Sequence, residues 1–483
     1  MNVPKMLEFT KGLALAVTDF YEHSMAAANM QEGIQGRQAV FDLVVRDLPA
    51  GKVVGTFMHN GVKYDELAKR DFIVNAGLEQ AAAYFLQARG TKRLRKYLEN
   101  VQGIQDEKFL GWAENLRFDG DMYAMLEGTI FFGQEHQIRI HERFEEAQML
   151  ESLLVSTVNP QTNVATTAND IAQVTSKLLL EGGSRRGTSP QSAVFNSRAA
   201  RIGGFNASSN VAYGLLTGEK VGGTHGHSYV MLHPTEYAAF EAQAKSLGDK
   251  VCFLLDTYNV KEAFETAIKI AKENNLERFA FRIDSGNLLE QAKWIHWEMA
   301  ARGFARAAYM LVASDDLTAA KIARLELEGA DIDSYLVGTY AVNPPQPMPG
   351  VYKLAAFQET GGHWVLRGKL SEDTVKATLP GIKQVYRVTG QDGYYRRDVI
   401  AFEGEDISAY LEPGDTAEGL LVPIIRAGRQ VYDFPAVDQI SQYRKEQLAR
   451  FRDIGHYEVV VSSCIRDVQR QILREHGMGA KAA

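Results

Sequence analysis

Residues 251–259, VCFLLDTYN, and residues 279–287, FAFRIDSGN, decide the fold class of this chain. Each is a short apolar run that ends in polar residues and is followed by a stretch with helical periodicity. The same pattern recurs in KVGGTHGH (220–227), YMLVASDD (309–316) and SYLVGTY (334–340). Strands that alternate with helices in this way predict a parallel α/β unit with both sheet faces covered. An α/β barrel and an open doubly wound sheet share this repeat, so the periodicity leaves both possible.

Strand-like segments on both sides of the repeat indicate a second domain. Apolar and polar residues alternate at 39–52 and 120–140, and strand-like runs return after residue 350. This pattern predicts an α+β domain formed from both chain ends, with the α/β unit between them. The expected domains are the N-terminal part of the α+β domain at 1–145, the α/β barrel at 146–345, and the C-terminal part with terminal helices at 346–483.

Length and composition exclude several classes of protein. With 483 residues, 45% hydrophobic and 23% charged, the chain is expected to form two or three globular domains. A net charge of −7 argues against nucleic acid as a partner. The longest apolar runs, such as 251–255, are far shorter than the roughly 20 residues of a membrane helix. The N-terminus does not resemble a secretory signal, and two cysteines exclude a disulfide scaffold and a Cys-rich zinc site. A cytoplasmic protein is expected.

Two polar turns follow the last two strands of the repeat. The first contains Ser314 and Asp315, and the second contains Gly338 and Thr339. Loops at these positions of an α/β barrel commonly offer backbone N–H groups to a phosphate. Gly338 alone is equally compatible with a simple tight turn. Two such loops in succession favour a phosphate site.

The segment GTHGH at 223–227 contains two histidines among small residues. A metal site would need a further ligand, and no other histidine or cysteine has a suitable spacing. A structural histidine at a strand end is the more common case. Asp256, at the end of the next strand, is nevertheless placed to hold one imidazole nitrogen of His227 and leave the other free as a nucleophile or base.

Two charged clusters complete the candidate chemistry. Arg282 and Asp284 are two positions apart, so both point to one side of a strand, where Asp284 suits magnesium or a ribose hydroxyl and a mutual salt bridge is the alternative. Residues 182–210 carry several arginines in glycine-rich surroundings. Arg185 is well suited to a carboxylate or phosphate, whereas Arg198 and Arg201 fit a solvated basic helix face.

These segments, taken together and in order, resemble the nicotinate phosphoribosyltransferase family over residues 13–440, nearly the whole chain. The matching motifs are TDFY (18–21), SRRG (184–187), IGGF (202–205), GTHGHS (223–228), LDTY (255–258), RIDSG (282–286), VGT (337–339), VYKL (351–354) and PGIKQVYR (380–387).

The resemblance implies an irregular, TIM-like α/β barrel joined to an α+β domain. It implies that nicotinate attacks C1 of phosphoribosyl pyrophosphate in the presence of Mg²⁺, giving nicotinate mononucleotide and pyrophosphate in NAD salvage. It also implies that ATP, as a co-substrate, phosphorylates His227, which makes this residue a phosphohistidine oriented by Asp256. Family members act as homodimers in which an aromatic residue of one subunit reaches the partner's site, and the matching position is Tyr21.

Each substrate then has an expected set of residues. Nicotinate needs a stacking face and a cation, which Tyr21 and Arg185 would supply, while Ser209 would distinguish the acid from its amide. Asp284 is expected near the ribose or its Mg²⁺. The phosphoribosyl pyrophosphate residues are expected to be Arg46, Arg282, Ser314, Asp315, Gly338, Thr339 and Lys353.

Three positions depart from the family's pattern, and other functions remain open. Gly182 stands where many relatives have an aromatic residue, Asn287 where an aspartate is common, and Gly226 where alanine is usual. The alternatives are a phosphoribosyltransferase for nicotinamide or quinolinate, a catalytically silent nucleotide-binding homologue, and an unrelated phosphosugar barrel. No strand end offers the Schiff-base lysine of such a barrel, which makes it the weakest alternative.

Overall fold

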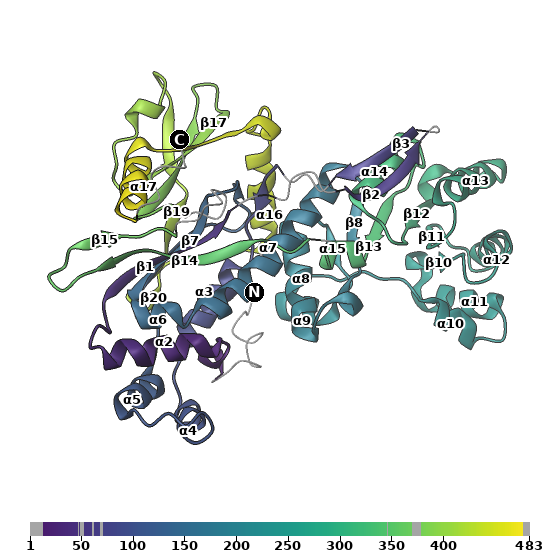
Figure 1. Ribbon diagram of the computed structural model, residues 1–483. Helices are drawn as coiled ribbons and strands as arrows, with labels where there is room; N and C mark the ends of the chain where they lie inside the picture. Colours follow the sequence, from purple (N-terminus) through teal and green to yellow (C-terminus); the bar gives the residue numbers. More distant parts are fainter. Residues whose placement is uncertain are drawn as a thin grey trace. The chain divides into compact units, whose positions relative to one another are not determined.

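The chain forms two compact units in the computed structural model, which describes residues 13–46, 48, 53–59, 62–67, 71–344, 346–369 and 378–476 (Figure 1). Unit 1 consists of Met1–Val53, Leu67–Asn163 and Gln346–Ala483. Unit 2 consists of Val54–Glu66 and Val164–Pro345. The helix α7 (Glu151–Gln173) contributes its first part to unit 1 and its second part to unit 2.

Unit 1 is built on an antiparallel sheet that joins the two ends of the chain. Its order is β15-β14-β1-β7-β5-β19-β20, and the central strand β1 (Gln38–Val45) pairs with β7 (His136–Arg143) on one side and β14 (Gly350–Gln358) on the other. The predicted strand near 39–52 and the strands after residue 350 are therefore neighbours in space. The remaining strands are β5 (Asp121–Met125), β15 (Trp364–Leu366), β19 (Leu421–Arg426) and β20 (Arg429–Gln430).

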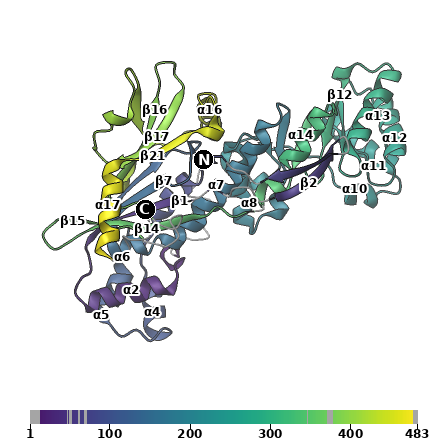
Figure 2. The same cartoon turned by 45° about the horizontal axis from the view of Figure 1, so that its top comes forward.

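A smaller sheet and several helices complete unit 1. The smaller sheet has the order β18-β16-β17-β21, and a core of buried apolar side chains includes Val45 of β1 and Val385 of β16. Figure 2 shows α2, α4 and α5 gathered together, and buried residues such as Met30, Leu98 and Phe109 form their common core. These elements are β16 (Lys383–Thr389), β17 (Tyr395–Phe402), β18 (Thr416–Gly419), β21 (Glu458–Val461), α2 (Phe20–Gln31), α3 (Leu78–Gln87), α4 (Lys92–Asn100), α5 (Glu107–Asn115), α6 (Phe144–Gln148), α16 (Val437–Leu448), α17 (Ser463–Glu475), and the short pair β4 (Ile73–Val74) and β6 (Ile130–Phe131).

Unit 2 contains the predicted parallel sheet, with the order β10-β11-β12-β13-β8-β9. Among the strands that the structure describes, the edge strands β9 and β10 have no further partner, so closure into a TIM-like barrel is not confirmed. The strands are β8 (Leu178–Glu181), β9 (Ala207–Ser208), β10 (Cys252–Leu254), β11 (Phe279–Ile283), β12 (Tyr309–Ala313) and β13 (Ser334–Val337), and β2 (Val53–His59) and β3 (Val62–Leu67) form a separate pair.

Capped helices follow the strands of unit 2 and fix the turns between them. Asn259, Asn287 and Thr318 accept backbone N–H groups at the starts of α12, α13 and α14. Such caps satisfy N–H groups that a helix leaves without an intrahelical partner. Asn287, which departs from the family's aspartate, is therefore a helix cap. The helices of unit 2 are α8 (Pro190–Ile202), α9 (Val211–Thr217), α10 (His227–Leu232), α11 (Glu236–Leu247), α12 (Val260–Glu273), α13 (Leu288–Ala301), α14 (Ala319–Leu327) and α15 (Thr339–Val342).

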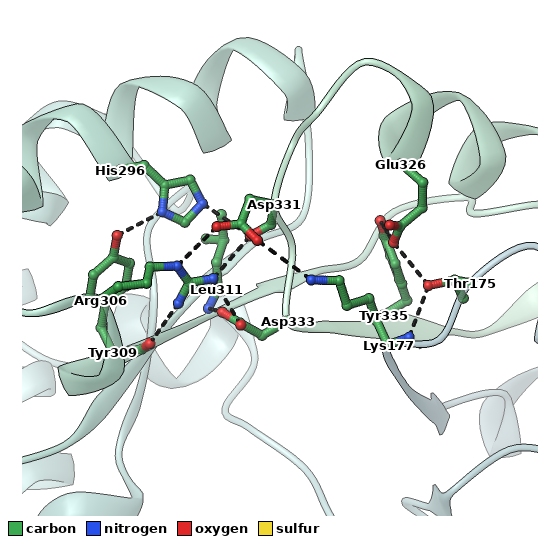
Figure 3. Close-up of polar contacts among 10 residues, drawn as sticks. All are labelled: Thr175, Lys177, His296, Arg306, Tyr309, Leu311, Glu326, Asp331, Asp333 and Tyr335. Carbon is green, nitrogen blue, oxygen red and sulfur yellow. Dashed lines mark hydrogen bonds and ion pairs between the residues drawn. The ribbon is translucent and has the colours of Figure 1, made fainter.

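The amino ends of these parallel strands are held by a network of ion pairs (Figure 3). Arg306, before β12, pairs with Asp331 at 3.0 Å and with Asp333 at 2.8 Å, both before β13. Asp333 also accepts the backbone N–H of Leu311 at 2.7 Å. Lys177, before β8, lies 3.5 Å from Asp331. This network fixes the strands at one end, while the polar turns after the strands lie at the other.

No helix among the residues described is both long enough and apolar enough to cross a membrane.

Candidate active site

His227 and Asp256 form the first pair of candidate residues in unit 2. His227 begins α10, Asp256 follows β10, and His227 Nε2 lies 3.2 Å from Asp256 Oδ1. Ser285 donates its hydroxyl to the other carboxylate oxygen of Asp256 at 2.5 Å. Because an ionised carboxylate only accepts, Asp256 fixes the imidazole with its proton on Nε2, which leaves the Nδ1 lone pair free. This is the arrangement required for a nucleophilic imidazole.

The other histidine of the GTHGH segment is buried. His225 is 8% exposed, and its ring lies beside those of Tyr229 and Phe240, with centroids 5.4 and 6.0 Å away. Burial, with a smaller effect from Arg282, lowers the pKa of His225 to about 4, so its ring is neutral near pH 7. His225 therefore has a packing role, while the side chain of His227 is 39% exposed and accessible to a ligand.

Arg282 links the turns after β11 and β12 with the loop that precedes α10. Its guanidinium donates to Ser314 Oγ at 2.8 Å and to Thr224 Oγ1 at 2.8 Å, and it pairs with Asp284 Oδ1 at 2.9 Å. A guanidinium has five N–H donors in one plane, so one side chain can hold several loops at once. The salt bridge between Arg282 and Asp284, one of the two alternatives for this motif, is therefore present. Asp284 also lies close to His227 and Asp256: one ligand atom from each of these three residues lies within 4.8 Å of the others.

A cavity of about 180 Å³ lies at this edge of the sheet. Residues from four strand-to-helix turns and from the strands β11 and β13 line it: Gly182, Arg185, Arg186, Arg282, Asp284, Ser314, Asp315, Asp316, Leu336, Gly338 and Thr339. Most of the candidate residues of unit 2 therefore share one cavity. Asp315 has a φ of 116°, which side-chain-bearing residues rarely adopt, and such strain is concentrated at functional turns.

Glu181, at the end of β8, organises the turn beside this cavity. Its side chain is fully buried, and its carboxylate accepts the backbone N–H of Gly183, the hydroxyl of Ser197 at 2.9 Å and the hydroxyl of Ser208 at 2.6 Å. Its carbonyl accepts the backbone N–H of Ser209 at 2.8 Å. Ser209 is absent from the cavity lining, and the Glu181 bonds hold it in the segment next to that lining.

The arginines of residues 182–210 lie in two places, at the cavity and in the protein interior, and the second was not predicted. Arg185 and Arg186 form part of a short 3₁₀ helix, Ser184–Arg186, at the cavity. Arg198 and Arg201, expected on a solvated helix face, are buried. That expectation was wrong because Arg201 is neutralised by Glu219 at 2.9 Å, a partner outside its own helix.

Unit 1 carries Tyr21, Lys353 and Arg46. Tyr21 is 47% exposed, and its hydroxyl lies 3.4 Å from Glu151 Oε2, while Lys353 Nζ lies 3.4 Å from Glu151 Oε1. Glu151 thus brings Tyr21 and Lys353 to one place on unit 1. Partial burial, together with the Glu151 charge, raises the pKa of Tyr21 to about 12, so the phenol is neutral near pH 7.

Arg46 and Lys353 also line a cavity of about 190 Å³ within unit 1. Two further cations line it, Lys383 and Arg466, and Lys383 pairs with buried Asp42 at 2.7 Å. Among the lining residues that the structure describes, cations outnumber the one carboxylate, which favours an anion.

Comparisons with known proteins identify relatives of this chain. A family profile described as the nicotinate phosphoribosyltransferase (NAPRTase) N-terminal domain matches residues 16–159. Nicotinate phosphoribosyltransferase of Bacillus subtilis is 34% identical over 454 residues, which cover 89% of this chain and 88% of that protein. The chain belongs to the nicotinate phosphoribosyltransferase family. A nicotinate phosphoribosyltransferase of Mycobacterium tuberculosis is 30% identical over 463 residues, covering 93% of this chain and 91% of the relative.

Solved structures show that this family member shares a known fold. Human nicotinic acid phosphoribosyltransferase matches with a TM-score of 0.75 and 23% identity, over 94% of this chain and 99% of that one. Nicotinate-nucleotide pyrophosphorylase from Pyrococcus furiosus matches with a TM-score of 0.68 and 23% identity, over 92% and 97% of the two chains.

Several residues of the site were not singled out from the sequence. Thr224 and Ser285 lie inside motifs shared with the nicotinate phosphoribosyltransferase family, GTHGHS and RIDSG, so their position was a usable signal. Glu181 precedes the glycine pair 182–183. The sequence does not show that its carboxylate is buried and accepts hydrogen bonds from distant serines. Leu336 is an apolar strand residue, and no local pattern marks it as a cavity residue.

Proposed function

We propose that this chain transfers the phosphoribosyl group of phosphoribosyl pyrophosphate to nicotinate, forming nicotinate mononucleotide and pyrophosphate in NAD salvage. The observation that carries the proposal is the joining of His227, Asp256, Asp284 and Arg282 at one edge of the unit 2 sheet, beside a cavity with two further arginines. Family membership supports the same reaction, since the relatives are named for it.

Asp284 is the proposed carboxylate at the ribose. Loss of pyrophosphate leaves positive charge on the ribose ring, and a fixed carboxylate stabilises such charge best where it develops. Arg282 holds Asp284 at 2.9 Å and keeps its orientation. The Ser314–Asp315 and Gly338–Thr339 turns are the proposed site of the 5′-phosphate, because these four residues line the same cavity.

The pyrophosphate would be bound by cations of unit 1. Arg46 and Lys353 line a cavity in which cations outnumber carboxylates, and this surplus supports an anionic ligand there. Arg282, which lines the unit 2 cavity, is likewise a proposed phosphoribosyl pyrophosphate residue.

Mg²⁺ is the proposed metal, with Asp284 and Asp256 as the protein groups that would hold it. The donor set fits, because both offer carboxylate oxygens, which Mg²⁺ prefers, and these oxygens lie within 4.8 Å of each other. When bound, Mg²⁺ supplies charge neutralisation for the pyrophosphate group. His227 is a poor ligand for this cation, in keeping with a different role.

ATP is the proposed co-substrate, and His227 its phosphorylation site. The lone pair on Nδ1 would attack the γ-phosphorus of ATP, forming a nitrogen–phosphorus bond as ADP leaves. Asp256 would stabilise the positive charge that develops on the imidazole through its contact with Nε2.

A homodimer is proposed because the base site would otherwise lack a stacking ring. Arg185 would pair with the nicotinate carboxylate and Ser209 would donate to it. The cavity lining of unit 2 contains no aromatic ring among the residues described, whereas Tyr21 of unit 1 is 47% exposed and available to a second copy.

Steady-state assays with nicotinate, nicotinamide and quinolinate test the proposal, each with phosphoribosyl pyrophosphate and Mg²⁺, with and without ATP. Preferred turnover of nicotinate is expected, whereas preference for either other base would replace the proposed substrate. Nucleotide binding without pyrophosphate release would favour a catalytically silent homologue.

His227→Ala tests the ATP step separately. The variant should retain basal transfer and lose stimulation by ATP, and it should acquire no phosphate from γ-labelled ATP. Equal stimulation in the variant and the wild type would remove His227 from this role.

A further inference from the structure

Leu336 is the one large apolar side chain that lines the unit 2 cavity, as far as the residues described extend. The other lining residues are glycines, arginines, aspartates, a serine and a threonine. A pyridine ring carries its polar groups at the edge and presents two apolar faces, which are favoured against apolar surface. Within this lining, Leu336 alone offers such a surface.

The side chain of Leu336 fills the space beside Gly182, between the neighbouring strands β8 and β13. Leu180 of β8 is paired with Leu336 of β13, and the backbone N–H of Gly182 donates to the carbonyl of Val337 at 2.8 Å. A Cβ atom at position 182 would lie 2.6 Å from Leu336 Cδ1 and 3.2 Å from Leu336 Cγ. The φ of Gly182 lies outside the left-handed region, so the leucine side chain excludes a larger residue there and the backbone does not.

We infer that Leu336 forms the apolar wall of the base-binding site, in the space that a side chain at position 182 would otherwise fill. The inference rests on the proposed function, and it names the residue that a flat pyridine carboxylate contacts with its ring face. Arg185 lines the same cavity and is available to the carboxylate at the ring edge. The pair Gly182 and Leu336 then sets the thickness of the slot that admits the base.

Paired substitutions test whether the two positions share this space. Leu336→Ala should raise KM for nicotinate at least about tenfold, since even one methylene contact in an apolar pocket is worth about 10- to 200-fold in discrimination. KM for phosphoribosyl pyrophosphate should stay within about twofold, because the proposed phosphate turns are unchanged. Leu325→Ala is the matched control, since Leu325 is a buried leucine of α14 outside the cavity lining.

Gly182→Phe gives the reciprocal test. Alone, it should lower kcat/KM for nicotinate at least about tenfold, because its Cβ meets Leu336. Combined with Leu336→Gly, the phenylalanine has room to take the place of the leucine. The double variant should therefore have a higher kcat/KM for nicotinate than Gly182→Phe or Leu336→Gly alone. A double variant no better than the product of the single effects would overturn the inference.

Direct contact can be measured without turnover. In protein labelled at the leucine methyl groups, nicotinate ring protons should show a nuclear Overhauser effect to one leucine, and the signal should vanish in Leu336→Ala but persist in Leu325→Ala. Its absence, or its survival in Leu336→Ala, refutes Leu336 as the wall. A wild type that binds nicotinate through Leu336 but forms no mononucleotide would instead refute the proposed function and leave the wall established.

Discussion

Replacement of Glu181 by glutamine should destabilise unit 2 by about 2–5 kcal/mol. The buried carboxylate accepts the N–H of Gly183 on one oxygen and the hydroxyls of Ser197 and Ser208 on the other. An amide oxygen can replace only one of these two acceptors. If the amide oxygen faces the serines, the NH₂ group faces the Gly183 N–H; if it faces Gly183, the NH₂ group donates to the serine oxygens and the Ser208 hydroxyl loses its acceptor. In either orientation a buried donor loses its acceptor, which costs about 1–3 kcal/mol. Two charge-assisted bonds also become neutral ones, at about 0.5–1 kcal/mol each.

Urea unfolding with hydrogen exchange of the peptides around Gly183 and Ser209 measures this effect. Faster exchange is expected around Gly183, because the Glu181 side chain holds that N–H, whereas the Ser209 N–H keeps its acceptor, the backbone carbonyl of residue 181. Ser197→Ala is the control, since it removes one bond and should cost only about 1 kcal/mol. A Glu181→Gln protein within about 0.5 kcal/mol of the wild type, with unchanged exchange, would refute this account of the turn.

Three further predictions follow from individual contacts. Asp284→Asn should lower kcat at least about tenfold, which corresponds to roughly 1.4 kcal/mol of transition-state stabilisation, and near-normal turnover in a steady-state assay would make the carboxylate structural. Ser209→Asp should lower kcat/KM for nicotinate because a carboxylate there repels the substrate's own, and an unchanged value would remove Ser209 from base recognition. His225 has its pKa lowered to about 4 in the folded protein, so between pH 6.5 and 4 the unfolded chain binds the additional proton and stability falls as the pH falls. His225→Phe should remove up to about 3 kcal/mol of that loss, measured by urea unfolding at a series of pH values.

The location of the site could be predicted because parallel strands place their carboxyl ends at one edge. Asp256, Asp284, Ser314 and Gly338 each follow a short apolar run, and β10, β11, β12 and β13 are neighbours in the same order as in the sequence. Polar residues that follow these strands therefore gather at one edge of the sheet, where the carboxyl ends of the strands lie. His227 does not follow this rule: the strand expected at 220–227 is wrong, since residues 220–226 form a loop and His227 begins α10, from where it reaches Asp256.

Contacts between distant segments could not be predicted from the sequence. Arg198 and Arg201 have the pattern of a solvated helix face, and their burial depends on partners such as Glu219 that the local sequence does not place beside them. Leu336 excludes a larger side chain at position 182 only because β8 pairs with β13, and these strands are far apart in the chain. Closure of a barrel is likewise decided by edge strands and not by the repeat of strands and helices.

The most direct test of the central claim is phosphorus NMR of the purified protein incubated with nicotinate, phosphoribosyl pyrophosphate and Mg²⁺. The account predicts that the substrate signals decline while free pyrophosphate and a mononucleotide phosphate appear in equal amounts, only when nicotinate is present. Unchanged phosphoribosyl pyrophosphate, or its hydrolysis at the same rate with and without nicotinate, would contradict the assignment of phosphoribosyl transfer to this site.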